Sequence, residues 1–284
     1  MKYFVKQTPL QNKLDQYRNN GKTIGFVPTM GALHDGHLKL VRASVLECDV
    51  SVCSIFVNPT QFNDATDLVK YPRNLTKDSA MLKSAGLHIL FAPNINEVYP
   101  KGLDTRVDID LAGLDTTLEG AFRPGHFEGV VQVVKRLVDF VQPDFLYMGQ
   151  KDFQQFTIIR HMIKTLHLPV KLVVIPTERE PGGLAMSSRN ERLSPEYRKK
   201  ARVIFETLNA SKNLIEKESL ETIKSDALKI ITDAGLIPEY FEIVDGNTLQ
   251  LIQDPARHEY IVGVVAAWAD GVRLIDNEIF KGGN

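Results

Sequence analysis

The sequence predicts an α/β protein in two parts: a doubly wound parallel sheet in the N-terminal part and a smaller α+β domain in the C-terminal part. Up to about residue 176, short and nearly continuous apolar runs alternate with amphipathic stretches of helical spacing. That alternation is typical of a parallel sheet covered by helices on both faces. Beyond that point, strand-like runs follow one another without long helices between them, which favours an antiparallel sheet.

The first part opens with a helical stretch at residues 9–18, where Leu10, Leu14 and Tyr17 share one face. Five apolar runs then indicate buried strands at residues 22–29, 49–59, 87–93, 143–149 and 169–177. Helices are expected between them at residues 37–47, 76–85, 127–141 and 151–167. The stretch at 127–141 is rich in β-branched residues, but its length and spacing favour a helix.

A polar, glycine-rich stretch at residues 178–190 follows the last of these strands. After it, the spacing predicts two helices within residues 194–234 and then strands at 238–245, 259–269 and 272–276. We therefore expect a Rossmann-like domain at residues 1–176 and an α+β domain at residues 177–284.

The composition narrows the classes of partner. A formal net charge of −1 gives no overall positive field for nucleic acid or an anionic membrane. The N-terminus has no charged-then-apolar leader, and no apolar stretch reaches the roughly 18 residues of a membrane span. The two cysteines, Cys48 and Cys53, lie among apolar residues and are expected to be packing thiols. We expect a cytoplasmic protein.

The stretch PTMGALHDGH, residues 28–37, is the first candidate site. It lies where a predicted strand leads into a predicted helix, and ligands of open α/β sheets bind at that edge. The N-terminus of a helix attracts phosphate, and Gly31 and Gly36 allow the backbone to come close to it. His34 and His37 would then donate to phosphate oxygens as charge develops on them.

The stretch AMSSRN, residues 185–190, is the second candidate. The HxGH pattern of residues 34–37 looks like the signature of nucleotidyl-transferring α/β enzymes. Those enzymes often carry a second loop with serines and a base. The KMSKS loop of class I aminoacyl-tRNA synthetases is such a loop. A mobile cationic loop that closes over a triphosphate would also protect a water-sensitive intermediate.

The chain resembles the pantoate–β-alanine ligases over nearly its whole length. The resemblance rests on six stretches in order: PTMGALHDGH, SIFVNPTQF, YPR at 71–73, RPGHFEGV at 123–130, GQKDFQQ at 149–155 and GLAMSSRN at 183–190. This resemblance implies an ATP-dependent condensation of (R)-pantoate with β-alanine. The products would be pantothenate, AMP and pyrophosphate, formed through a pantoyl-adenylate.

The resemblance also implies which residues bind ATP. They are Met30, Gly31, Ala32, Leu33, His34, Asp35, Gly36, His37, Gly149, Gln150, Lys151, Asp152, Glu178, Met186, Ser187, Ser188 and Arg189. His37, usually given the proton-donor role, is expected to act in catalysis with His34, Lys151 and Arg189. Lys151 should meet phosphate as a point charge, and Asp152 the ribose.

Pantoate is implied to lie between Gln61 and Gln155, with Gln61 also near β-alanine. Amide side chains suit hydroxyls and carboxylates because they donate and accept without adding charge. Pro28, Met30 and Phe62 are expected to form apolar walls of the same pocket. Four further residues match active-site positions of the family: Asn58, Tyr71, Arg123 and His126.

Several expectations rest on the resemblance or on ATP chemistry alone. The second domain should form a lid over the active site, and the chain should be a homodimer. Mg²⁺ should accompany ATP; its protein ligands are unknown, with Asp78 as a candidate. Glu178 replaces an apolar residue common in the family. Pro181 stands at an unexpected place, where it would stiffen the entrance to the loop.

Three alternatives remain open. Another HxGH nucleotidyltransferase would join its substrate to the nucleotide permanently, so release of AMP separates it from the ligase. A relative of the synthetases that binds RNA lacks the expected excess of basic residues. A non-catalytic nucleotide-binding subunit would not need both histidines and the second loop.

Overall fold

The structure, a computed structural model, describes residues 1–62, 68, 69 and 71–283. It divides into two compact units. The first contains Met1–Gly149 and Ile158–Ile175, and the second contains Gln150–Thr157 and Pro176–Asn284. The domain division at 176/177 stays a prediction, and the compact units differ from it chiefly because Gln150–Thr157 groups with the second unit.

The first unit is built on a six-stranded sheet with the order β1-β4-β3-β2-β5-β6. All of its strand pairs are parallel, which confirms the predicted doubly wound class. The strands are β1 (Lys2–Phe4), β2 (Ile24–Thr29), β3 (Val50–Ile55), β4 (Ile89–Phe91), β5 (Phe145–Gly149) and β6 (Lys171–Ile175). The sequence analysis missed β1, because three residues are too few to show a period.

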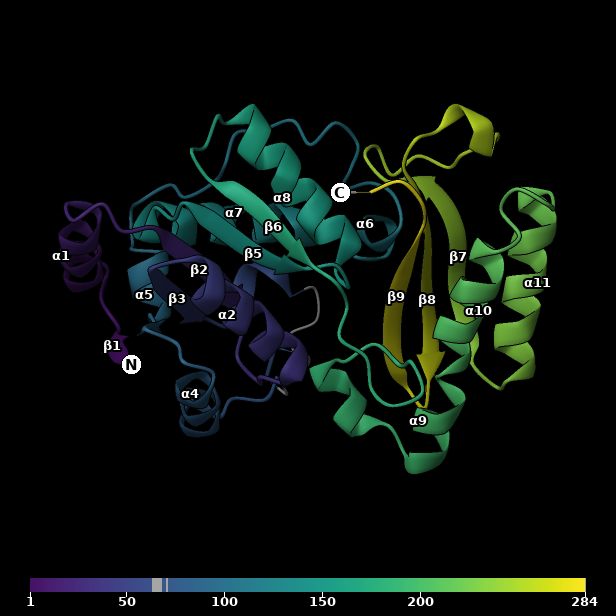
Figure 1. The fold of residues 1–284 in the computed structure, drawn as a ribbon, viewed down its shortest axis with the longest axis horizontal. Coiled ribbons are helices and arrows are strands. Elements are labelled where there is room, and N and C mark those ends of the chain that lie inside the picture. Colours follow the sequence, from purple (N-terminus) through teal and green to yellow (C-terminus); the bar gives the residue numbers. More distant parts are fainter. Residues whose placement is uncertain (63–67, 70, 284) are drawn as a thin grey trace. The chain divides into compact units, whose positions relative to one another are not determined.

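Helices flank this sheet (Figure 1). They are α1 (Gln7–Arg18), α2 (Asp35–Glu47), α4 (Leu75–Ser84), α5 (Ile95–Val98), α6 (Glu119–Phe122), α7 (His126–Val141) and α8 (Phe153–Thr165). α2 packs on β2 and β5, and α1 packs on α7. The Val-rich stretch at 127–141 is helical, as its length predicted, and it buries one apolar side chain after another.

The start of β2 packs closely against α2. A Cβ on Gly25 would lie 2.3 Å from Oγ of Ser44 and 2.8 Å from Sγ of Cys48, so only glycine fits there. Both cysteines are buried. Burial raises the pKa of the Cys53 thiol to about 12, so that thiol stays protonated and packs as a small apolar group.

The second unit contains a three-stranded antiparallel sheet with the order β7-β8-β9. Its strands are β7 (Ile237–Asp245), β8 (Ile261–Ala269) and β9 (Val272–Lys281). Asp270 and Gly271, with φ of 52° and 69°, form the two-residue turn that joins β8 to β9. The antiparallel sheet is the one that the sequence predicted.

Helices α10 (Val203–Lys212) and α11 (Leu220–Asp233) share one apolar core with this sheet (Figure 1). A further helix, α9 (Pro195–Lys200), precedes them. The prediction of two helices was therefore one short. The Ser194 side chain caps α9 and Pro195 occupies its first turn, which starts a separate short helix. Among the described residues, no helix is long and apolar enough to cross a membrane.

Candidate functional site

The PTMGALHDGH stretch joins β2 to α2 at the carboxyl end of a central strand. β2 ends at Thr29 and α2 begins at Asp35, so His37 lies in the first turn of the helix. Gly31 and Ala32 both adopt positive φ, 82° and 51°, which turns the chain sharply between them. The first N–H groups of a helix have no partner inside it, so the turn presents a natural position for an anion.

The two histidines of this stretch lie side by side. The backbone N–H of His34 donates to Nδ1 of His37 over 3.4 Å, and the ring centroids are 4.0 Å apart. A neutral His37 that accepts at Nδ1 carries its proton on Nε2. The bond therefore fixes which nitrogen of His37 can donate to a ligand.

Asp78 on α4 holds the same turn in place. Its side chain accepts from the backbone N–H groups of Ala32 and Leu33, each over 2.9 Å, and it is 2% exposed. A Cβ on Gly31 would lie 3.0 Å from Oδ2 of Asp78, so the turn is packed onto the carboxylate. The structure therefore gives Asp78 the task of orienting the turn, which the sequence analysis did not anticipate.

Gln61 lies in a polar cluster with three of the other predicted residues. Its Nε2 donates to Sδ of Met30 over 3.2 Å, and its Oε1 accepts from Nδ2 of Asn58 over 3.1 Å. Nδ1 of His126 lies 2.8 Å from the backbone oxygen of Gln61. The Asn58 amide also donates to the backbone oxygen of Gly129, over 3.0 Å, which ties the cluster to α7. Gln61 is 8% exposed and thus held in one orientation.

Tyr99 belongs to this cluster and was missed by sequence reasoning. Its hydroxyl donates to Oδ1 of Asn58 over 2.9 Å, and burial raises the pKa of the phenol, so it remains a donor. No local motif marks Tyr99, because its partner lies far away in the sequence. Tyr71 stacks edge-on against Phe62 with centroids 5.7 Å apart, and Arg123 directly follows the last residue of α6.

A cavity of about 810 Å³ in the first unit adjoins the turn. It lies at the carboxyl ends of β2, β3 and β4, and its lining includes Met30, Gly31 and Asp78. Residues 63–67 and residue 70, which precede the YPR stretch, lie outside the described residues.

The second unit holds the other predicted nucleotide-binding residues except Gly149. Gly149 is the last residue of β5 in the first unit, and Gln150, Lys151 and Asp152 follow it in the second. Nζ of Lys151 lies 3.8 Å from Oδ1 of Asp152, and the Lys151 side chain is 20% exposed. Gln155 lies on the first turn of α8 and is half-buried. Gln61 belongs to the first unit and Gln155 to the second.

Residues 178–186 of the predicted loop form a hairpin in the structure. Arg179 and Ala185 form an antiparallel bridge, and Met186 N–H donates to the Glu178 oxygen over 2.9 Å. Asn190, 2% exposed, donates to Oε1 of Glu180 over 2.8 Å and to the Ala185 oxygen over 3.0 Å. Glu178 thus contributes its backbone to the hairpin, whatever its side chain.

Ser187 and its neighbours follow this hairpin directly. The Ser187 side chain accepts from Arg189 N–H over 3.2 Å and caps the short helix Ser188–Arg192. A cavity of about 520 Å³ in the second unit is lined in part by Gln150, Thr177 and Arg179. Of the predicted nucleotide-binding residues, Gln150 therefore lines this cavity. Glu178 and Met186 are joined by a backbone hydrogen bond at the base of the hairpin.

Comparison with known proteins agrees with this geometry. The family model for pantoate–β-alanine ligase matches residues 2–279. The chain is 49% identical to the pantothenate synthetase of Azobacteroides pseudotrichonymphae over 273 residues, covering 94% of this chain and 96% of that protein. The pantothenate synthetase of Bacteroides thetaiotaomicron is also 49% identical, over 96% of each chain.

Solved structures show the same fold. A pantothenate synthetase from Thermus thermophilus superposes with a TM-score of 0.91 at 40% identity, covering 99% of this chain and 100% of that one. A Francisella tularensis pantoate–β-alanine ligase, complexed with β-γ ATP and β-alanine, gives a TM-score of 0.80 at 34% identity over 100% and 99% of the two chains. The chain belongs to the pantoate–β-alanine ligase family.

Proposed function

We propose that this ligase joins (R)-pantoate to β-alanine in two steps, with a pantoyl-adenylate between them. In the first step a pantoate carboxylate oxygen attacks the α-phosphorus of ATP, and pyrophosphate leaves. In the second step the β-alanine amine attacks the acyl carbon of the adenylate, and AMP leaves with the electrons of the broken acyl–oxygen bond. The products are pantothenate, AMP and pyrophosphate.

The observation that carries the proposal is the paired histidines at the start of α2. The first step needs alignment and neutralisation of charge rather than a protein nucleophile. The N-terminus of α2 supplies N–H groups and partial positive charge. His37 adds a donor at Nε2, and its proton can pass to an oxygen of the departing pyrophosphate.

We assign the remaining charge stabilisation to residues of the second unit. Lys151 contributes a point charge at the phosphates, and Ser187, Ser188 and Arg189 donate to the triphosphate. Their support is the resemblance together with the hairpin that holds the loop. Asp152 would accept from the ribose hydroxyls.

Pantoate presents hydroxyls and a carboxylate on one side and a geminal dimethyl group on the other. We propose that Gln61 and Gln155 bind the polar side and that Pro28, Met30 and Phe62 wall the apolar side. Asn58 and His126 act through Gln61, because both contact it and thereby set its orientation. Gln61 would also lie near the amine of β-alanine. Tyr71 and Arg123 complete the same region of the proposed site.

Three further features belong to the proposal. Mg²⁺ would enter bound to ATP, because the metal offsets the charge of the triphosphate and keeps phosphate oxygens among its ligands. The second domain would close over the substrates as a lid. The enzyme would work in the cytoplasm as a homodimer.

An exchange assay tests the two-step reaction. Because formation of the adenylate needs no amine, the protein should exchange labelled pyrophosphate into ATP with pantoate alone. Omission of each substrate from the complete reaction should abolish pantothenate, and AMP should appear in equal amount to pantothenate. Exchange that strictly requires β-alanine would contradict the adenylate, and a nucleotide-containing end product would indicate another nucleotidyltransferase.

A further inference from the structure

Two consecutive residues of β9, Asp276 and Asn277, are polar and almost fully buried. Asp276 is 4% exposed and Asn277 is 1% exposed. Asp and Asn are uncommon inside strands, and buried polar groups must be satisfied by partners. Their partners are the two segments that the sequence analysis assigned to ATP.

Asn277 holds the segment that contains Lys151. Its Nδ2 donates to the backbone oxygen of Gln150 over 3.0 Å and to that of Lys151 over 2.9 Å. Its Oδ1 accepts from the side-chain amide of Gln150 over 3.2 Å. One amide therefore makes three hydrogen bonds, all to the chain from which the Lys151 side chain projects.

Asp276 holds the start of the serine-containing loop. Its carboxylate receives both terminal nitrogens of Arg179, over 2.5 Å and 3.1 Å. Arg179 donates further to the backbone oxygen of Gly183 over 3.0 Å, which ties down the hairpin. Burial raises the pKa of Asp276, and the Arg179 charge opposes that rise. Glu278, paired with Lys212 over 2.8 Å, lies 4.0 Å from Arg179.

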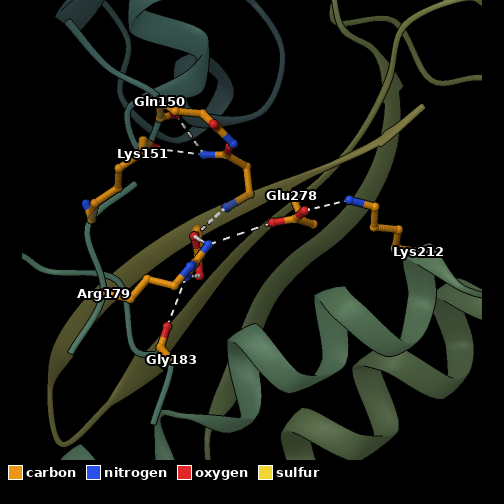
Figure 2. A network of polar contacts seen from close by, with 8 residues as sticks. Gln150, Lys151, Arg179, Gly183, Lys212 and Glu278 are labelled. Carbon is orange, nitrogen blue, oxygen red and sulfur yellow. Dashed lines mark hydrogen bonds and ion pairs between the residues drawn. The ribbon is translucent and has the colours of Figure 1, made fainter. Parts of the chain in front are cut away.

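The two sets of contacts diverge because successive side chains of a strand point to opposite faces. Figure 2 shows Gln150 and Lys151 on one side of the strand and Arg179 with Gly183 on the other. β9 carries both residues at one edge of its sheet. One rigid strand thus joins two loops that are distant in the sequence.

We propose that Asp276 and Asn277 are positioning residues, which hold residues 149–152 and 178–189 in fixed register so that Lys151 and the Ser187–Arg189 group meet one triphosphate together. The proposal rests on the proposed function, since it takes both segments to bind ATP. It assigns to β9 a role that is separate from any contact with substrate.

The test compares Asn277→Ala with the wild-type enzyme in the pyrophosphate exchange assay. The variant should raise the KM for ATP about tenfold or more, because small misplacements of a binding group cost that much. The KM for pantoate should change less than about threefold, because only the nucleotide segments are displaced. Asn277→Ser, which keeps one donor, should recover part of the loss. A calorimetric titration with ATP alone should show the same order of affinities.

A double-mutant cycle separates positioning from general support of the fold. If Asn277 acts through Lys151, then Asn277→Ala should add little to the loss that Lys151→Ala already causes. Glu242→Gln serves as the matched control, because Glu242 lies on β7, the opposite edge of the same sheet, and the change removes its 2.6 Å ion pair with Lys224 on α11. It should lower the melting temperature without raising the KM for ATP.

Additive losses in the cycle, or an unchanged KM for ATP in a folded Asn277→Ala, would overturn the proposal. Should Asn277→Ala fail to fold, Arg179→Lys tests the other arm: it keeps the charge but loses the forked bond, and it should raise the KM for ATP. An unchanged KM for ATP in Arg179→Lys would also overturn the proposal. Failure of exchange in the wild-type enzyme would instead count against the proposed function.

Discussion

At the scale of single residues, the histidine pair shows how a backbone bond prepares a side chain for chemistry. The His34 N–H occupies Nδ1 of His37, so the neutral ring presents its proton at Nε2. Lys151 differs, because an ammonium group has no tautomers and can donate from any of its hydrogens. Its position depends on the backbone that Asn277 holds. Both side chains are proposed to meet phosphate in the transition state.

We therefore expect His37→Ala and Lys151→Ala each to lower turnover about 100-fold or more, the scale of losing one transition-state donor. The measurement is the initial rate of pyrophosphate exchange at saturating substrates, beside a thermal melt of each variant. His161→Ala is a control, because that imidazole bonds the backbone oxygen of Asp110 instead. A variant that keeps near-normal adenylation would remove its residue from the proposed phosphate site.

At the scale of elements, the sequence predicted what depends on local period and missed what depends on distant partners. Strands β2 to β6 of the parallel sheet were all expected, because each is a continuous apolar run next to a helical stretch. The turn before α2 was expected to bind phosphate from its glycines and histidines. The carboxylate of Asp78 was not expected to orient that turn, since it comes from α4, 45 residues after Leu33 in the chain.

Asp78→Asn tests this link between α4 and the turn. The amide keeps one acceptor but places N–H groups against a backbone N–H, so the turn should loosen. We expect a lower melting temperature and a KM for ATP raised about tenfold. The matched control is Asp144→Asn, since the Asp144 carboxylate accepts from Ile24 N–H over 2.7 Å at the other end of β2.

Asp144→Asn should also lower the melting temperature, but it should leave the KM for ATP unchanged. Equal changes in the KM for ATP in both variants would mean that Asp78 only supports the sheet. A lower melting temperature in Asp78→Asn without any change in the KM would lead to the same conclusion.

At the scale of the whole molecule, the chain builds two compact units and passes between them more than once. Residues 150–157 lie between two strands of the parallel sheet in the sequence, yet they group with the second unit. The sequence could not predict this, because the contacts come from Asn277, more than a hundred residues later. The available signal was an Asp–Asn pair, two residues that are uncommon inside strands, in the strand-like run at 272–280.

Each unit contains a carboxylate with a lowered pKa, which makes the stability of the fold depend on pH. Lys22 donates to Asp49, as do the backbone and hydroxyl of Thr23, and together they lower the Asp49 pKa from 3.8 to about 2. Burial raises the pKa of Asp245, but His258 and the N–H groups of a turn outweigh burial and lower it. Asp49 ties the starts of β2 and β3 together, and Asp245 ends β7.

A carboxyl whose folded pKa lies below its unfolded pKa stabilises the protein above the unfolded value. That contribution is lost as pH falls toward the folded value. For Asp49 the loss therefore falls between about pH 4 and pH 2. We expect the melting temperature to decline through this range, and Asp49→Asn to flatten the decline, because the amide cannot be protonated there. Circular dichroism melts at fixed ionic strength check this, with the exposed Asp226→Asn as a control for net charge. An Asp49→Asn slope equal to that of the wild-type protein would show that the Lys22 and Thr23 bonds do not stabilise the fold.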